Sequence, residues 1–70
     1  MKIILLKKKS INPNFEIFLC AWYKETNSDA EFVVWTSEKV EDEKNREFIS
    51  GEYFNDDLKA AVKRFEERIY

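Results

Sequence analysis

Histidine is missing from this 70-residue chain, and cysteine, glycine, proline and methionine occur once each. The lone Cys20 excludes a disulfide within the chain. It also leaves too few nitrogen and sulfur ligands for a zinc site, and the carboxylates follow no loop spacing typical of a calcium site. No nucleophile is paired with a base in a recognisable motif. We therefore expect no metal, no cofactor and no enzymatic activity, with Cys20 serving as a small core residue.

The scarcity of glycine and proline predicts that most of the chain lies in regular elements. Seventy residues are fewer than an average domain contains, so we expect residues 1–70 to form a single domain with one core. A domain of this size buries only roughly 60% of the surface that its unfolded chain exposes. Because a disulfide and a metal are excluded, dense packing of the 16% aromatic residues or oligomerisation must supply the missing stability.

Neither sign of charge is in large excess, since 12 basic residues face 14 acidic ones and the formal net charge is −2. This balance argues against a strongly basic nucleic-acid binder and against a DNA mimic of dense negative charge. The first residues, MKIILLKKK, contain a short apolar run with its lysines after it, which is the wrong order for a signal peptide and too short for a membrane span. We expect a cytoplasmic protein of its host cell.

Four segments have the composition of β-strands. Residues 3–6 are a continuous aliphatic run, and residues 15–24 (FEIFLCAWYK) and 31–37 (EFVVWTS) are rich in aromatic and β-branched side chains. Residues 48–54 (FISGEYF) have similar content interrupted by Gly51. They are predicted to form a short edge strand with a bulge or turn at the glycine.

The C-terminal segment predicts an amphipathic helix. Asn55 is the expected N-cap, and Asp56 and Asp57 would place negative charge in the first turn, where the helix dipole favours it. The apolar stripe has a period of 3.6 residues and consists of Leu58, Ala61, Val62, Phe65 and Ile69. The predicted fold class is therefore α+β, with an antiparallel sheet of three or four strands and one C-terminal amphipathic helix packed on one face.

Both faces of the predicted sheet are apolar, because successive strand residues point to opposite sides. One helix covers one face, which leaves a second face centred on Phe18, Trp22 and Trp35. Three alternatives follow for this face. Residues 40–46 or the N-terminal segment could cover it within the monomer, two copies could associate through it, or it could bind another macromolecule. On the last alternative, Phe18, Trp22 and Trp35 form a candidate binding surface.

The segments between the predicted strands are polar, with turn residues at 10–14 and 27–29 and a charged loop, or one weak helical turn, at 40–46. An acidic cluster extends on both sides of this loop and contains Glu38, Glu41, Asp42, Glu43 and Glu47. It is either a solvated loop or a surface that meets a basic groove on a partner and competes there with nucleic acid.

The lysine run from Lys7 to Lys9 has two interpretations. Lysines at a strand end block pairing between sheet edges. They could also contact phosphates while the sheet aromatics stack on bases, as in single-strand-binding sheets.

The second half of the chain resembles small strand-then-helix proteins that are common in bacterial prophages and mobile elements. The resemblance rests on Val34-Trp35-Thr36, on the corner formed by Gly51, Tyr53 and Phe54, and on an acidic helix start followed by Ala61, Phe65 and Arg68. Phage proteins of this size without catalytic residues are often inhibitors of host defence nucleases, anti-CRISPR proteins among them.

The resemblance implies a non-catalytic inhibitor or adaptor that binds a larger host protein, such as a nucleic-acid-processing defence complex. It would act by steric and electrostatic blocking, with Trp22 and Trp35 as anchors. Two alternatives remain open: a small nucleic-acid-binding regulator that uses Lys7 to Lys9 and the sheet aromatics, and a homodimeric structural module.

Overall fold

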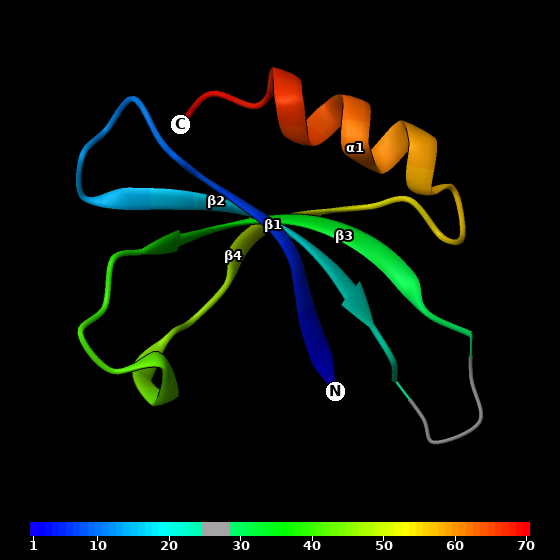
Figure 1. Ribbon diagram of the computed structural model, residues 1–70, viewed down its shortest axis with the longest axis horizontal. Helices are drawn as coiled ribbons and strands as arrows, with labels where there is room; N and C mark the ends of the chain where they lie inside the picture. The colour runs from blue at the N-terminus through cyan, green and yellow to red at the C-terminus, as the bar shows by residue number, and fades with distance from the viewer. Residues whose placement is uncertain (25–28) are drawn as a thin grey trace.

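A computed structural model describes residues 1–24 and 29–70 of the chain. Its elements are β1 (Lys2–Lys9), β2 (Phe15–Trp22), β3 (Glu31–Glu38), a 3-10 helix η1 (Glu43–Asn45), β4 (Ile49–Tyr53) and α1 (Leu58–Glu67). Within the described residues the strands form one antiparallel sheet in the order β1-β2-β3-β4, so β1 and β4 are its edges. The predicted α+β fold is confirmed, with four strands and one C-terminal helix on one face (Figure 1).

The two central strands have large side chains buried on both faces. β2 and β3 pair without interruption from Phe15 opposite Glu38 to Trp22 opposite Glu31. A strand buried on both sides has a continuous apolar sequence instead of an alternating one, which explains the unbroken runs in both segments. α1 packs over β2 and β3 on one side, and the segment containing η1 lies on the other (Figure 1).

The helix face of the core contains Ile17, Leu19, Val34, Ala61 and Phe65. The predicted stripe is correct for Ala61, Val62 and Phe65, whereas Leu58 is 43% exposed and the expected N-cap is wrong. Asp57 caps the helix, its Oδ1 accepting from the Ala60 amide at 3.0 Å. Asn55 lies in the preceding turn with φ 52°, a left-handed conformation that asparagine tolerates better than most residues.

The helix also ends earlier than the stripe predicts. Arg68 leaves helical geometry (φ −64°, ψ 132°), and Ile69 lies beyond the helix, 70% exposed. The cause is the Arg68 side chain, which is buried and donates to Thr36 Oγ1 at 3.2 Å and to Glu52 Oε1 at 2.6 Å. Satisfying the buried Thr36 hydroxyl in this way ties the end of the helix to β3 and β4.

Glu52 is the acceptor that holds the helix to the sheet edge. It receives hydrogen bonds from Arg64 Nε at 2.9 Å as well as from Arg68. The hydrogen bonds from Arg64 and then Arg68 lower the pKa of Glu52 below its ordinary value of 4.5. Because its pKa is lower in the folded state, Glu52 stabilises the fold fully above the unfolded-state pKa, and this contribution is lost as the pH falls through the folded-state value.

We expect the melting temperature to fall as the pH is lowered from about 5 to about 3, and to fall less steeply in a Glu52→Gln variant. Thermal unfolding followed by circular dichroism across this range measures the difference. Glu41→Gln is the control, since Glu41 is exposed and makes no ion pair in the described part of the chain. Parallel curves for wild type and Glu52→Gln would contradict the assignment.

The irregularity expected at Gly51 is confirmed. The β3–β4 register shifts between Val34 and Thr36, and Ser50 has φ 55°. A Cβ on Gly51 would lie 2.4 Å from Trp35 Nε1, so only glycine lets the indole lie against this strand. The strand covers fewer residues than predicted, because Phe48 and Phe54 leave it and pack against opposite faces of the sheet.

Part of one predicted turn, residues 27–28, lies outside the described residues. The helices found in residues 1–24 and 29–70 are all too short or too polar to cross a membrane.

Candidate functional site

The second sheet face is covered by the chain itself. The Phe18 and Trp35 side chains are 0% and 5% exposed. Phe48 packs on both, with ring centroids 5.3 Å from Phe18 and 5.1 Å from Trp35. Of the three alternatives for this face, the one observed is therefore coverage within the monomer by the segment that follows β3. The part of this segment that contains Arg46 and Phe48 is called the cover below.

Trp22 keeps part of its surface outside this cover. It is half-buried and packs against Trp35 and Tyr53 at centroid distances of 5.7 Å and 5.9 Å. The structure thus brings Phe18, Trp22 and Trp35 together in one cluster, as the strand alternation predicts. Their role in binding a partner stays a prediction, and Phe18 and Trp35 could contact a partner only after the cover opened.

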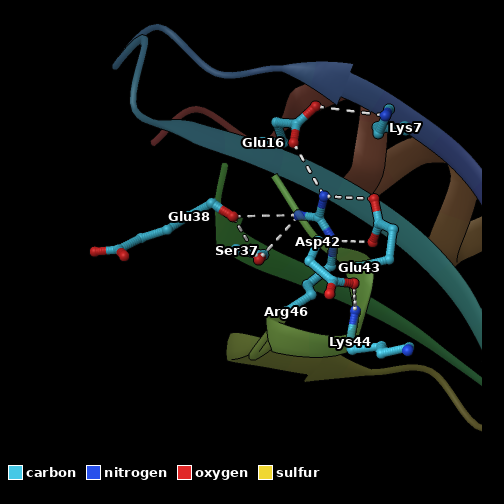
Figure 2. Close-up of polar contacts among 8 residues, drawn as sticks. All are labelled: Lys7, Glu16, Ser37, Glu38, Asp42, Glu43, Lys44 and Arg46. Atoms are coloured by element: carbon cyan, nitrogen blue, oxygen red, sulfur yellow. Dashed lines mark hydrogen bonds and ion pairs between the residues drawn. The ribbon is translucent and has the colours of Figure 1, made fainter. Parts of the chain in front are cut away.

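Arg46 connects the segment after β3 to the sheet, and Figure 2 shows its polar contacts. Its side chain is only 4% exposed, and its guanidinium lies 4.4 Å from the Phe18 ring centroid. The guanidinium donates to Glu43 Oε2 at 2.7 Å, Ser37 Oγ at 3.0 Å and Glu16 Oε1 at 3.3 Å. These contacts join the loop to β2 and β3, and the planar guanidinium suits both the forked hydrogen bonding and the stacking on an aromatic ring.

Arg46 lies in the predicted charged loop, and its role in joining that loop to the sheet was not predicted from the sequence. A local signal was present, because Glu43 and Arg46 have opposite charges three residues apart. Their pairing lowers the pKa of Glu43, chiefly through the hydrogen bond from Arg46. The same signal says nothing of Ser37 and Glu16, which are distant in sequence.

The acidic cluster divides into two groups. Glu43 is bonded to Arg46, and Asp42 caps η1 by accepting from the Lys44 amide at 3.0 Å (Figure 2). The remaining members are exposed and make no ion pair in the part of the chain that the structure describes: Glu38, Glu41 and Glu47. Glu38 and Glu47 line a hollow between the end of β3 and the segment that connects it to β4. Within the described residues, the members of this second group are the acidic residues of the cluster that meet a partner without first giving up a contact of their own.

The β1 edge has the largest exposed run of aliphatic side chains. Ile3, Ile4, Leu5 and Leu6 are each between 42% and 45% exposed. α1 packs over β2 and β3, and Ile3–Leu6 belong to neither of the two core clusters. A long apolar strand at a sheet edge is a site for pairing with another chain.

Backbone hydrogen bonds define which groups of β1 face outward. Met1 and Tyr23 exchange both bonds, at 2.8 and 2.9 Å, so the next residue, Lys2, lies in a pair without mutual bonds. Bonded and non-bonded pairs alternate in an antiparallel ladder. Beyond the irregularity between Ile4 and Leu6, the bond from the Ser10 amide to the Phe15 carbonyl at 3.3 Å continues the same alternation. The amides and carbonyls of Lys2, Ile4, Lys7 and Lys9 therefore point away from the sheet.

The lysine run lies at one end of this edge. Lys7 pairs with Glu16 at 3.6 Å, and Lys8 Nζ donates to the Glu66 carbonyl at 3.0 Å and lies 5.2 Å from the Phe65 ring centroid. Lys9 is exposed and forms no ion pair within residues 1–24 and 29–70. Lys9 is therefore open to a negatively charged group beside the strand, Lys7 keeps about half of its side chain exposed beside Glu16, and the Lys8 ammonium is engaged with α1.

Cys20 lies in the core, as predicted, and is fully buried. Burial raises the pKa of its thiol to about 11, so the thiol is protonated at neutral pH and is a poor nucleophile. Among the described residues, no group of three or more histidine, cysteine, aspartate or glutamate side chains could hold a metal ion.

Comparison with protein-family models, with curated proteins and with solved structures finds no match to this chain. The resemblance to prophage and mobile-element proteins therefore stays a prediction from the residues.

Proposed function

We propose that this protein is a non-catalytic protein-binding module whose main contact is the free edge of β1. The single observation that carries the proposal is the run Ile3–Leu6, four aliphatic side chains more than 40% exposed on a strand whose outer edge has no neighbouring strand within the described residues. A partner segment that adds to this edge gains main-chain hydrogen bonds and buries the aliphatic side chains. Both gains come from groups that already stand in strand geometry.

The other edge of the sheet is less suited to strand addition. β4 has five residues against eight in β1, and its pairing with β3 is irregular. Ser50 interrupts it with a left-handed conformation, and Glu52 is engaged with α1. Short, twisted edges with such interruptions resist pairing with other chains, which leaves β1 as the favoured edge.

We propose further that binding blocks a larger protein sterically and electrostatically. The exposed acidic residues Glu38, Glu41 and Glu47 would repel nucleic acid from the occupied surface. The expected target, a host defence protein that processes nucleic acid, and the expected cytoplasmic location come from the resemblance. The proposal of a β1 contact does not depend on either.

The alternative of a nucleic-acid-binding regulator is supported less well. It requires bases to stack on sheet aromatics, and Phe18 and Trp35 lie beneath Phe48 and Arg46. Two of its three lysines also have contacts within the chain. Binding through lysines and phosphates would weaken steeply with salt, whereas binding through the aliphatic β1 edge would weaken little.

The proposal is tested by a pull-down, in which the tagged protein is used to capture its partner from a nuclease-treated host lysate. An Ile4→Thr, Leu6→Thr variant keeps strand propensity but removes apolar surface, and we expect it to lose the partner. The matched control is Ile11→Thr, which removes an aliphatic side chain that is 75% exposed in the β1–β2 turn. Circular dichroism checks that all three proteins are folded.

Capture that survives in the β1 variant but is lost on Trp22→Ser would assign the contact to the aromatic side instead. Recovery of nucleic acid alone, and only from untreated lysate, would favour the regulator. A dimer of wild type in light scattering that the β1 variant abolishes would favour the homodimeric module.

A further inference from the structure

Resting on the proposed function, we infer that the strand that pairs with β1 is an extended segment of another protein, antiparallel to β1, in which acidic residues precede aliphatic ones. Charge and register along β1 specify this chemistry. After Lys2, the strand has two unlike parts, aliphatic from Ile3 to Leu6 and cationic from Lys7 to Lys9.

The cationic part lies where an antiparallel partner begins. In antiparallel pairing the N-terminal part of the incoming segment lies opposite the C-terminal part of β1. Lys7 and Lys9 have outward-facing backbone groups and share the face of their register partners Phe18 and Glu16, while Lys8 lies on the helix face opposite Ile17. An acidic residue of the incoming strand opposite Lys7 or Lys9 therefore meets a lysine on one face of the sheet, and one opposite Lys8 meets a lysine on the helix face.

The aliphatic part defines the rest of the segment. Ile3 and Leu6 share the helix face with Ala21 and Leu19, and Ile4 shares the other face with Cys20. An incoming strand continues the sheet with its side chains on both of these faces. Aliphatic and β-branched residues are the side chains that bury this surface and suit a strand.

A second copy of this chain does not satisfy the charge pattern. The two-fold antiparallel register that pairs all four aliphatic residues places Ile3 opposite Leu6 and Ile4 opposite Leu5. It also places Lys2 of each copy opposite Lys7 of the other. Like charges directly opposite in a sheet are destabilising, so the lysines oppose self-pairing while they favour an acidic partner strand.

The antiparallel direction follows from the sheet, in which every observed strand pair within the described residues is antiparallel. Antiparallel pairs are also slightly more stable per residue than parallel pairs.

The position of the C-terminal residue allows a direct test by fusion. The Tyr70 carbonyl accepts from the Asn12 amide at 3.1 Å, so residue 70 lies beside the lysine end of β1 (Figure 1).

The experiment fuses a test strand after Tyr70 through a short Gly/Ser linker, which gives an effective concentration on the order of millimolar. The first fusion has an acidic run followed by an aliphatic run, matched in length to the two parts of β1. The second replaces the acidic run by lysines, and the third reverses the order of the two runs. Amide hydrogen exchange by NMR measures protection at Ile4, Lys7 and Lys9, whose amides face outward, and at Ile3 and Lys8 as internal references.

We expect the first fusion to protect the outward amides about fivefold more than either of the others. In a Lys9→Glu background most of this preference should disappear, and the lysine fusion should gain protection. The matched control is Lys59→Glu, which makes the same change in net charge on the exposed side of α1 and should leave the preference unchanged.

The failing outcomes are distinguishable. Equal protection by the acidic and lysine fusions would overturn the inference and leave β1 as the binding edge. No protection by any fusion would overturn the β1 proposal itself. Protection that rises with protein concentration in the unfused chain, or on adding a single-stranded oligonucleotide, would assign the edge to a second copy or to nucleic acid and would also overturn the inference.

Discussion

A Phe18→Ala variant is expected to have a free energy of unfolding about 3–5 kcal/mol lower than wild type. The ring is fully buried between the sheet, Phe48 and the Arg46 guanidinium. Removing it takes away its transfer free energy and leaves a cavity that a close-packed core fills only partly. Because small domains are stable by about 5–15 kcal/mol, this is a large share of the total. Urea unfolding followed by circular dichroism measures the change.

Ile11→Ala is the control for this measurement. It removes a large aliphatic side chain that is 75% exposed, and we expect it to cost no more than about 0.5 kcal/mol. A Phe18→Leu variant keeps most of the volume and should lose less than Phe18→Ala, which gives a second reading where the alanine variant does not fold. Equal losses for Phe18→Ala and Ile11→Ala would mean that the second face of the sheet is open in solution.

An Arg46→Met variant is expected to lose about 3 kcal/mol of the free energy of unfolding. Methionine keeps the apolar stem over Phe18 but removes the donors to Glu16 and Ser37, so that Glu16 loses its buried counter-charge. The cover then separates from the sheet more often and wets Trp35. We therefore expect the tryptophan fluorescence of the folded variant to shift to longer wavelength.

Two further arginine variants separate charge from geometry. Arg46→Lys keeps the charge but lacks the fork and the planar stack, so its loss should lie between those of wild type and Arg46→Met. Arg64→Met removes an arginine whose ion pair with Glu52 is well exposed, and should cost much less than Arg46→Met. If Arg46→Met were as mild as Arg64→Met, with unchanged fluorescence, Arg46 would not hold the cover.

The sheet and helix were predictable because their signals are periodic and local. The alternation along β2 correctly separates Ile17 and Leu19 from Phe18 and Cys20, and the stripe from Ala61 to Phe65 correctly predicts the helix face. The end of the helix was not predictable in this way. It depends on Arg68 reaching Thr36, a contact between residues that are 32 positions apart.

The same limit applies to the candidate site. Strand alternation predicts that Phe18, Trp22 and Trp35 lie together, but whether they are exposed depends on where Phe48 and Arg46 pack. The run Ile3–Leu6 has the composition of a buried strand, and only the strand order shows that it lies at an edge. Exposure is a property of the whole fold, so composition places apolar residues in a strand without showing what covers them.

The strand order β1-β2-β3-β4 also bears on how the molecule forms and opens. Every strand pairs with its neighbour in sequence, so the sheet can grow one hairpin at a time, and such local pairing favours rapid folding. β1 is held on one side only and buries the least side-chain surface of the three longer strands, so it should be the first of these to detach when the molecule opens. The strand that we propose binds another chain is thus also expected to be among the last to pair stably during folding.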